Sequence, residues 1–146
     1  MAKRVTIDAS AALSWVLPGE QCRETAALRD RATEDPGLAL LVPPVFWYEI
    51  SNSLWVSIRR GRLDHENAMA ILEALVDFRF ETWVPDPGDC LSLALYHNIA
   101  AYDSAYLQVA LDVGSPLWTV DRQLAHAAMS SGLVVEPVPA SPSALP

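Results

Sequence analysis

The sequence predicts an α/β fold, a three-layer α/β/α sandwich around a central, mostly parallel five-stranded sheet. Short apolar runs alternate along the chain with longer segments of helical pattern, and this alternation is typical of parallel strands joined by right-handed helical crossovers. A chain of 146 residues suffices for one domain with a single core. We place that domain at residues 1–136 and a flexible, proline-rich tail at residues 137–146.

The expected strands are short and rich in apolar residues. They lie at 4–8, 38–42, 80–84, 116–120 and 133–136. The second strand is apolar throughout, which is typical of a strand that is buried on both faces. Helices are expected at 10–17, 20–33, 43–60, 64–78, 86–97, 103–113 and 121–131, with a short loop at 98–102 before the sixth helix.

Proline, glycine and capping residues mark several of these boundaries. Ser10 is a suitable cap for the first helix, and Asp64 for the fourth. Pro18-Gly19 ends the first helix. Pro43-Pro44 begins the third helix, where proline is tolerated in the first turn, and Gly61 ends it.

The composition narrows the classes of function. Ten basic and 18 acidic residues give a net charge of −8, so a nucleic-acid role needs local arginines, a metal ion or a partner. Cys22 and Cys90 are isolated, which argues against a zinc cluster or a disulfide framework. Uncharged stretches are shorter than the ~20 residues that span a bilayer. We therefore expect a soluble, cytoplasmic protein with no membrane role.

Four acidic residues fall at one end of the predicted sheet. Asp8 and Asp121 close the first and fourth strands, Asp103 opens the sixth helix, and Glu49 lies inside the third. Taken singly, Asp8, Asp103 and Asp121 have an ordinary explanation as helix caps or as first-turn acids. Glu49, taken alone, has an equally ordinary explanation as a residue that faces solvent. Their shared position favours a single site, because ligands bind at the carboxyl ends of the strands in open α/β sheets.

The chemistry of such a site follows from charge repulsion. Two carboxylates ~4 Å apart repel by roughly 4 kcal/mol at an effective dielectric constant near 20, so a cation is needed to hold several of them together. Oxygen ligands favour Mg²⁺ or Mn²⁺ over zinc. The three histidines form no ligand-like pair. Magnesium bound by carboxylates activates water and stabilises phosphoryl oxygens, which indicates phosphodiester hydrolysis.

The third helix carries a polar patch beside its apolar stripe. Asn52 and Ser53 follow Glu49 at helical spacing and share its face. The apolar stripe of the same helix is formed by Phe46, Ile50 and Leu54.

Five segments carry a resemblance to a known family. They are residues 5–13, 15–20, 42–54, 102–107 and 119–125, and their order and spacing extend over nearly the whole chain before the tail. Together they resemble the PIN-domain family and, within it, the VapC-type toxins of bacterial toxin–antitoxin pairs. The resemblance implies an Mg²⁺- or Mn²⁺-dependent endoribonuclease that acts on RNA, forms a homodimer and is blocked at its active-site groove by a cognate, VapB-like antitoxin.

The resemblance also assigns residues. It implies that the metal-binding and catalytic quartet is Asp8, Glu49, Asp103 and Asp121. Ser10 and Thr119 match small hydroxyl positions near the quartet, and Asn52 matches a polar helix position that orients the site. Arg122 is a candidate for a contact with RNA phosphate. The remaining candidates are three arginines around Gly61, namely Arg59, Arg60 and Arg62. They either contact RNA phosphate, contact the antitoxin, or only complement the dipole of the helix that ends there.

Two other functions remain open. In the first, the protein is a catalytically silent PIN-like interaction module whose acidic groove binds a basic partner segment. In the second, it is a phosphotransfer domain such as a receiver or an aspartyl-phosphate phosphatase. Such domains usually need a lysine near a later strand end, whereas the only lysine, Lys3, lies at the start of the first strand.

Overall fold

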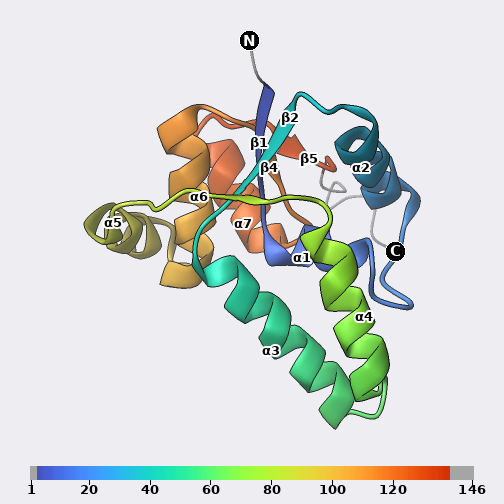
Figure 1. The fold of residues 1–146 in the computed structure, drawn as a ribbon. Coiled ribbons are helices and arrows are strands. Elements are labelled where there is room, and N and C mark those ends of the chain that lie inside the picture. The colour runs from blue at the N-terminus through green and yellow to red at the C-terminus, as the bar shows by residue number, and fades with distance from the viewer. Residues whose placement is uncertain (1–2, 139–146) are drawn as a thin grey trace, which may run out of the picture.

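The computed structural model describes residues 3–138, and within them a five-stranded sheet runs through the molecule (Figure 1). Its order is β3-β2-β1-β4-β5, and every neighbouring pair is parallel. The strands are β1 Lys3–Ile7, β2 Leu38–Val42, β3 Glu81–Thr82, β4 Leu117–Trp118 and β5 Val135–Glu136. The predicted five-stranded parallel sheet is therefore confirmed.

Seven helices cover the described part of the sheet. They are α1 Ala9–Ser14, α2 Arg23–Glu34, α3 Val45–Arg59, α4 His65–Val76, α5 Pro87–His97, α6 Ala101–Val113 and α7 Arg122–Ser130. In Figure 1, α5 and α6 lie on one side of the sheet and α2 on the other, while α3 and α4 form a pair that extends below it. This arrangement is the predicted layering of helices on both faces of a parallel sheet.

The core lies around the central strands. Val5, Thr6 and Ile7 of β1 are all buried, as expected for a strand with a neighbour on each edge and helices on each face. The Thr6 hydroxyl is hydrogen-bonded to the Ser115 hydroxyl at 2.8 Å, which satisfies a polar group that the fold removes from water. In β2 the last three residues are buried and the first two are partly covered.

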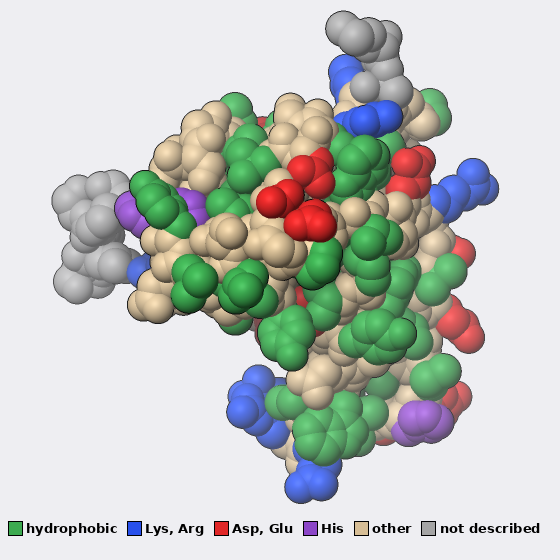
Figure 2. Space-filling view, turned by 90° about the vertical axis from the view of Figure 1, so that its left-hand side faces the viewer, with side chains coloured by type: hydrophobic (Ala, Val, Ile, Leu, Met, Phe, Trp, Pro, Cys, Tyr) green, Lys and Arg blue, Asp and Glu red, His purple; other side chains and the backbone are tan. Residues whose placement is uncertain are grey.

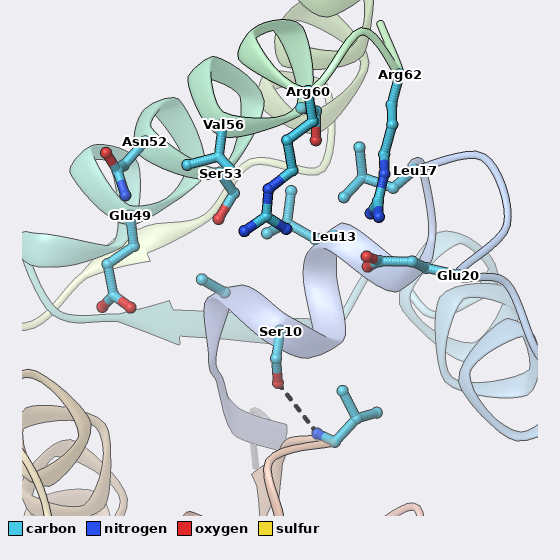
Figure 3. Close-up of a pocket in the computed structure, with 13 residues that line it drawn as sticks. Ser10, Leu13, Leu17, Glu20, Glu49, Asn52, Ser53, Val56, Arg60 and Arg62 are labelled. Carbon is cyan, nitrogen blue, oxygen red and sulfur yellow. Dashed lines mark hydrogen bonds between the residues drawn. The ribbon is translucent and has the colours of Figure 1, made fainter.

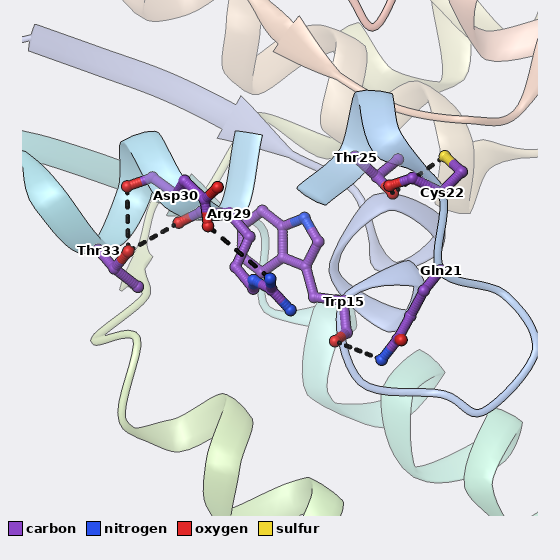
Figure 4. A network of polar contacts seen from close by, with 7 residues as sticks. All are labelled: Trp15, Gln21, Cys22, Thr25, Arg29, Asp30 and Thr33. Atoms are coloured by element: carbon purple, nitrogen blue, oxygen red, sulfur yellow. Dashed lines mark hydrogen bonds and ion pairs between the residues drawn. The ribbon is translucent and has the colours of Figure 1, made fainter. Parts of the chain in front are cut away.

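The segment between α1 and α2 is fastened to the core by side-chain contacts (Figure 4). The Gln21 side-chain amide donates to the Trp15 carbonyl at 3.3 Å, and the buried Thr25 hydroxyl donates to the Cys22 carbonyl at 3.2 Å. Trp15 itself is buried and packs on Phe78. Cys22 and Cys90 are both free thiols, Cys22 exposed and Cys90 buried.

Three strands are shorter than the sequence predicts. The expected strands 80–84, 116–120 and 133–136 are reduced to two residues each, as the bounds of β3, β4 and β5 show. Each of these three strands pairs with its neighbour over only two residues. An apolar run in the sequence extends past the last residue that forms hydrogen bonds with a neighbouring strand. Hydropathy alone does not indicate where this hydrogen bonding stops.

Several helix boundaries also differ from the predictions. Ser10 does not cap α1, because it already lies within the helix; Asp8 is the cap, with an extended backbone and a side chain that accepts from the Ala11 backbone N–H. The helix expected from residue 20 begins at Arg23. The helix expected from 103 begins at Ala101, because α5 ends in a left-handed residue that turns the chain at once. The prediction of Asp64 as the cap of α4 is confirmed.

No helix within residues 3–138 is long and apolar enough to cross a membrane. The tail predicted to be flexible is residues 137–146, and residues 139–146 of it lie outside the described residues. Pro137 and Val138 are described, and they border a hollow beside Cys22 and Arg122.

Candidate active site at the carboxyl end of the sheet

The four acidic residues of the predicted quartet come from four separate elements. Asp8 directly follows β1, Asp121 lies three residues beyond β4, Glu49 lies in the second turn of α3, and Asp103 lies in the first turn of α6. They are close enough to act on one another electrostatically: Asp121 raises the pKa of Asp8 and of Asp103, and Asp103 and Asp8 raise the pKa of Glu49. The fold therefore brings the predicted quartet together.

Asp8 is the most firmly held of the four. Its Oδ1 accepts from the Ala11 backbone N–H at 3.0 Å and from the Ser10 hydroxyl at 2.7 Å, and its Oδ2 accepts from the Thr119 hydroxyl at 2.6 Å. These hydrogen bonds lower the pKa, but burial is the larger effect and raises it to about 6. Within residues 3–138 no ion pair includes Asp8, so no basic side chain offsets the effect of burial.

Glu49 carries an unsatisfied polar atom. Burial, together with the charges of Asp103 and Asp8, raises its pKa to about 7, against a smaller lowering by Tyr106. Within the described residues, neither Glu49 Oε1 nor the Tyr106 hydroxyl makes a hydrogen bond of normal geometry, although both atoms are buried. Burial also raises the pKa of Tyr106, so this hydroxyl stays protonated. A buried carboxylate oxygen without a donor of normal geometry is costly to the fold.

Asp103 and Asp121 lie at helix starts. Asp121 caps α7, where its Oδ1 accepts from the Leu124 backbone N–H at 2.9 Å. Asp103 is not a cap, because α6 begins at Ala101 after an Ala100 cap that makes no side-chain bond. Burial and the neighbouring Asp121 raise the pKa of Asp103. Capping therefore explains Asp8 and Asp121 locally, and the helix dipole favours Asp103 in the first turn of α6, but neither effect explains Glu49.

The supporting polar residues occupy different places. Ser10 and Thr119 contact Asp8 directly, and Thr119 also accepts from the Asp121 backbone N–H at 3.0 Å. Asn52 makes neither contact and lines a groove next to Glu49. Arg122 is exposed and borders neighbouring hollows, not the groove that contains Glu49.

That groove, of about 390 Å³, extends from Glu49 along α3 (Figure 3). Glu49, Asn52 and Ser53 share one wall of it, which confirms the predicted polar face of this helix. The apolar stripe of α3 faces the other way, since Phe46, Ile50 and Leu54 are all buried. The side chains of Arg60 and Arg62 point into the far end of the groove.

The quartet is not neutralised within residues 3–138. The ion pairs there are Lys3–Asp35, Arg29–Asp30 and Arg31–Glu136, and none of them includes a quartet residue. In the same part of the chain, no three acidic, histidine or cysteine side chains are arranged so that they could hold one metal ion. The four carboxylates thus share an electrostatic site without forming a preset ligand cage.

Sequence reasoning did not find Tyr106. Its hydroxyl is the buried neighbour of Glu49, although Tyr106 comes from a different helix. Tyr106 lies three residues after Asp103 and therefore shares its helix face. This spacing is the only signal in the sequence, and an aromatic residue in an apolar helix is ordinarily assigned to the core.

Known proteins resemble this chain in sequence and in fold. No family model matches it. Ribonuclease VapC3 from Pyrobaculum aerophilum is 33% identical over 127 residues, which cover 84% of this chain and 93% of the relative. This chain belongs to the VapC-type PIN-domain family. Exonuclease VapC9 from the same organism is 32% identical over 77 residues, covering 53% of this chain and 58% of that protein.

Solved structures support this placement in the family. PAE2754 from Pyrobaculum aerophilum superposes with a TM-score of 0.70 at 26% identity, covering 92% of this chain and 90% of the other. FitAcB from Neisseria gonorrhoeae superposes with a TM-score of 0.61 at 14% identity, covering 90% and 95%. At that identity the second likeness concerns the fold alone.

Proposed function

We propose that this VapC-type chain is a metal-dependent endoribonuclease and the toxin of a toxin–antitoxin pair. The observation that carries the proposal is the un-neutralised group of four carboxylates, Asp8, Glu49, Asp103 and Asp121, of which Glu49 lines a groove. The relative that covers most of the chain is named a ribonuclease, which favours RNA as the substrate.

The residues of the quartet fit a hard divalent cation. All the donors are carboxylate oxygens, which suit Mg²⁺ or Mn²⁺, and Glu49 Oε1 is a buried oxygen with no other partner among the described residues. When bound, such an ion supplies an activated water and neutralises charge that develops on phosphate. Because three of these side chains are not yet arranged around one point, binding includes a side-chain rearrangement.

The residues of the chain have separable tasks in this scheme. Asp8 is immobilised by the Ala11 backbone N–H and the Ser10 and Thr119 hydroxyls, so its position costs no reorganisation. Glu49 is less restrained and is free to adjust. The raised pKa values of both describe the site without a cation, and a bound cation lowers them.

The direct test is RNA cleavage by the purified protein with added Mg²⁺ or Mn²⁺. We expect Asp8→Asn to reduce the cleavage rate by more than about 100-fold, because it removes one charge from the group that holds the cation. Asp64→Asn is the matched control, since Asp64 caps α4 in the same way but is not one of the four acidic residues of the quartet. Cleavage by Asp8→Asn at the wild-type rate would show that the assigned site is wrong.

One observation favours a second function, the catalytically silent interaction module. The quartet is not preset to hold a metal ion within the described residues, and an acidic groove is also suited to a basic partner segment. Native mass spectrometry with the product of a neighbouring small open reading frame would detect an antitoxin complex. Binding of this product, without any RNA cleavage after metal is added, would favour the silent module.

We also propose a homodimer. Exposed apolar side chains gather on α5 and at the start of α6, with Leu95 75% and Tyr96 83% accessible, and Figure 2 shows hydrophobic side chains over the face on which α5 lies. A patch of this kind is typical of a protein interface. Sedimentation should give a dimer for the wild type and a monomer for Leu95→Glu; a wild-type monomer would contradict the proposal.

A further inference from the structure

We propose that the groove that begins at Glu49 is a track for single-stranded RNA, and that Arg60 and Arg62 bind phosphates a few nucleotides away from the bond that is cleaved. This inference rests on the proposed ribonuclease function, because it assigns the substrate arm of the same site. It assigns a function to Arg60 and Arg62, for which the sequence did not distinguish phosphate binding, antitoxin binding and a helix-dipole role.

The shape of the groove fits a single strand. Its volume of about 390 Å³ is that of a small-molecule pocket, so it has no room for a duplex. The α3 wall runs from Glu49 to Arg60, a distance of about 16 Å along the helix axis at ~1.5 Å per residue. One stacked nucleotide advances a strand by roughly 3.4 Å. The arginines therefore lie several nucleotides beyond the quartet.

The walls carry groups that suit a phosphate–sugar backbone. Asn52, Ser53 and Ser57 line the groove between the quartet and the arginines, and amide and hydroxyl groups of this kind bind phosphate and sugar oxygens. Leu13 and Leu17 contribute apolar surface from the opposite wall (Figure 3). The groove thus offers polar groups for the backbone of a strand and apolar surface for its bases, although Val56 lies on the α3 wall and Ser10 and Glu20 on the opposite one.

The positive charges of Arg60 and Arg62, at the end of the groove away from Glu49, are available to bind a ligand. Arg60 and Arg62 are exposed, and neither takes part in an ion pair within residues 3–138. Figure 2 shows Lys and Arg side chains at the lower end of the molecule, where α3 ends. On a chain with a net charge of −8, a local cationic site is what a polyanion requires in order to bind.

Arg59 provides an internal comparison. It lies next to Arg60 at the same helix end, but its guanidinium lies over the Trp55 ring, 5.4 Å from the centroid, and it does not line the groove. A simple dipole role predicts similar behaviour for all three arginines. A phosphate track predicts that only Arg60 and Arg62 affect RNA binding.

Glu20 opposes the arginines. Its carboxylate lines the same end of the groove and points toward Arg62 (Figure 3). A carboxylate at this position repels phosphate and weakens the attraction of the arginines. Glu20→Gln should therefore strengthen RNA binding, the opposite of the arginine substitutions.

The experiment measures binding separately from cleavage. A short fluorescein-labelled single-stranded RNA is titrated with full-length Asp8→Asn protein, without metal, at several salt concentrations. We expect Arg60→Gln and Arg62→Gln each to weaken binding by about three- to tenfold and to reduce the slope of log K against log salt by about 0.7. Arg59→Gln should leave both values unchanged, and Glu20→Gln should tighten binding.

The outcomes separate this inference from the proposed function. If the wild type cleaves RNA while the Arg60 and Arg62 variants bind it normally, the track is wrong and the ribonuclease stands. If arginine-dependent binding persists but the wild type never cleaves, the ribonuclease is wrong and the track stands. An equal loss for Arg59→Gln, or loss of antitoxin binding with unchanged RNA affinity in the Arg60 and Arg62 variants, would overturn the track.

Discussion

Thr119 joins two of the four acidic residues through a single hydroxyl. The hydroxyl donates to Asp8 Oδ2 at 2.6 Å and accepts from the Asp121 backbone N–H at 3.0 Å. Because the residue is buried, neither bond is exchanged with water. Thr119 thereby sets how the end of β1 and the start of α7 lie relative to each other, and it belongs to the site as a positioning residue.

Replacing this hydroxyl tests that role. Thr119→Val keeps the shape but removes both hydrogen bonds, so the free energy of unfolding should fall by about 1–3 kcal/mol. The pKa of Asp8 should rise further, because the bond from Thr119 is the largest of the effects that lower it. Urea unfolding and the pH profile of cleavage measure the two effects. Thr119→Ser, which retains the hydroxyl, is the control, and equal behaviour of both variants would refute the role.

Asp103 should limit stability while it supports activity. Burial and Asp121 raise its pKa, which means that its charged form is held at a cost in the fold without metal. Asp103→Asn should therefore raise the melting temperature of the EDTA-treated protein and abolish RNA cleavage. A lower melting temperature in EDTA would show that Asp103 is not repelled by its neighbours.

At the scale of elements, α3 separates its tasks by face. One face packs Phe46, Ile50 and Leu54 into the core, and the adjacent face presents Glu49 and Asn52 to the groove. The helical period alone divides these positions. A helix that is anchored by its buried face holds its polar face in a fixed place, which a loop would not do.

The helices α1, α4 and α7 all begin with an aspartate cap, but only the caps of α1 and α7 belong to the quartet. Comparing them tests whether activity depends on where a capping aspartate lies. Asp8, Asp64 and Asp121 each accept a hydrogen bond from the backbone N–H three residues on. Asp64→Ala should cost about 1 kcal/mol of unfolding free energy and leave RNA cleavage unchanged. Thermal denaturation and a cleavage assay check both parts. Lost cleavage in a folded Asp64→Ala protein would extend the active site to α4.

At the scale of the whole molecule, stability depends on pH through the quartet. Burial raises the pKa of Asp8 to about 6 and of Glu49 to about 7, whereas both ionise near pH 4 in an unfolded chain. Between these values the folded protein holds protons that the unfolded chain has released. The free energy of unfolding should therefore fall as pH rises from about 4 to about 7.

Urea unfolding in EDTA across this range measures the effect, to which the rise of the Asp8 pKa alone, from 3.8 to about 6, contributes about 3 kcal/mol. Asp8→Asn should lose part of the pH dependence, because asparagine does not titrate. Added Mg²⁺ should restore stability near neutral pH, where the carboxylates are charged and bind it most strongly. Stability that is indifferent to pH, EDTA and Mg²⁺ alike would contradict a clustered site.

The sequence predicted most of the architecture correctly. Alternating apolar runs and helical segments indicated a parallel five-stranded sheet, and β2 was located at its observed bounds. The bounds of β3, β4 and β5 were too long, because a strand ends where its neighbour ends and hydropathy does not record that point. Ser10 was misassigned as a cap, since both Asp8 and Ser10 have suitable side chains and only the backbone conformation selects Asp8.

The sequence by itself determined which carboxylates meet, because parallel strands place their carboxyl ends along one edge of a sheet. The tertiary structure alone decided how they meet. Within residues 3–138 it buries Glu49 Oε1 without a donor of normal geometry, brings Tyr106 beside it from another helix, and leads a groove from Glu49 to Arg60 and Arg62. Burial and the direction of a side chain depend on neighbours that are distant along the chain, and a local pattern contains no record of them.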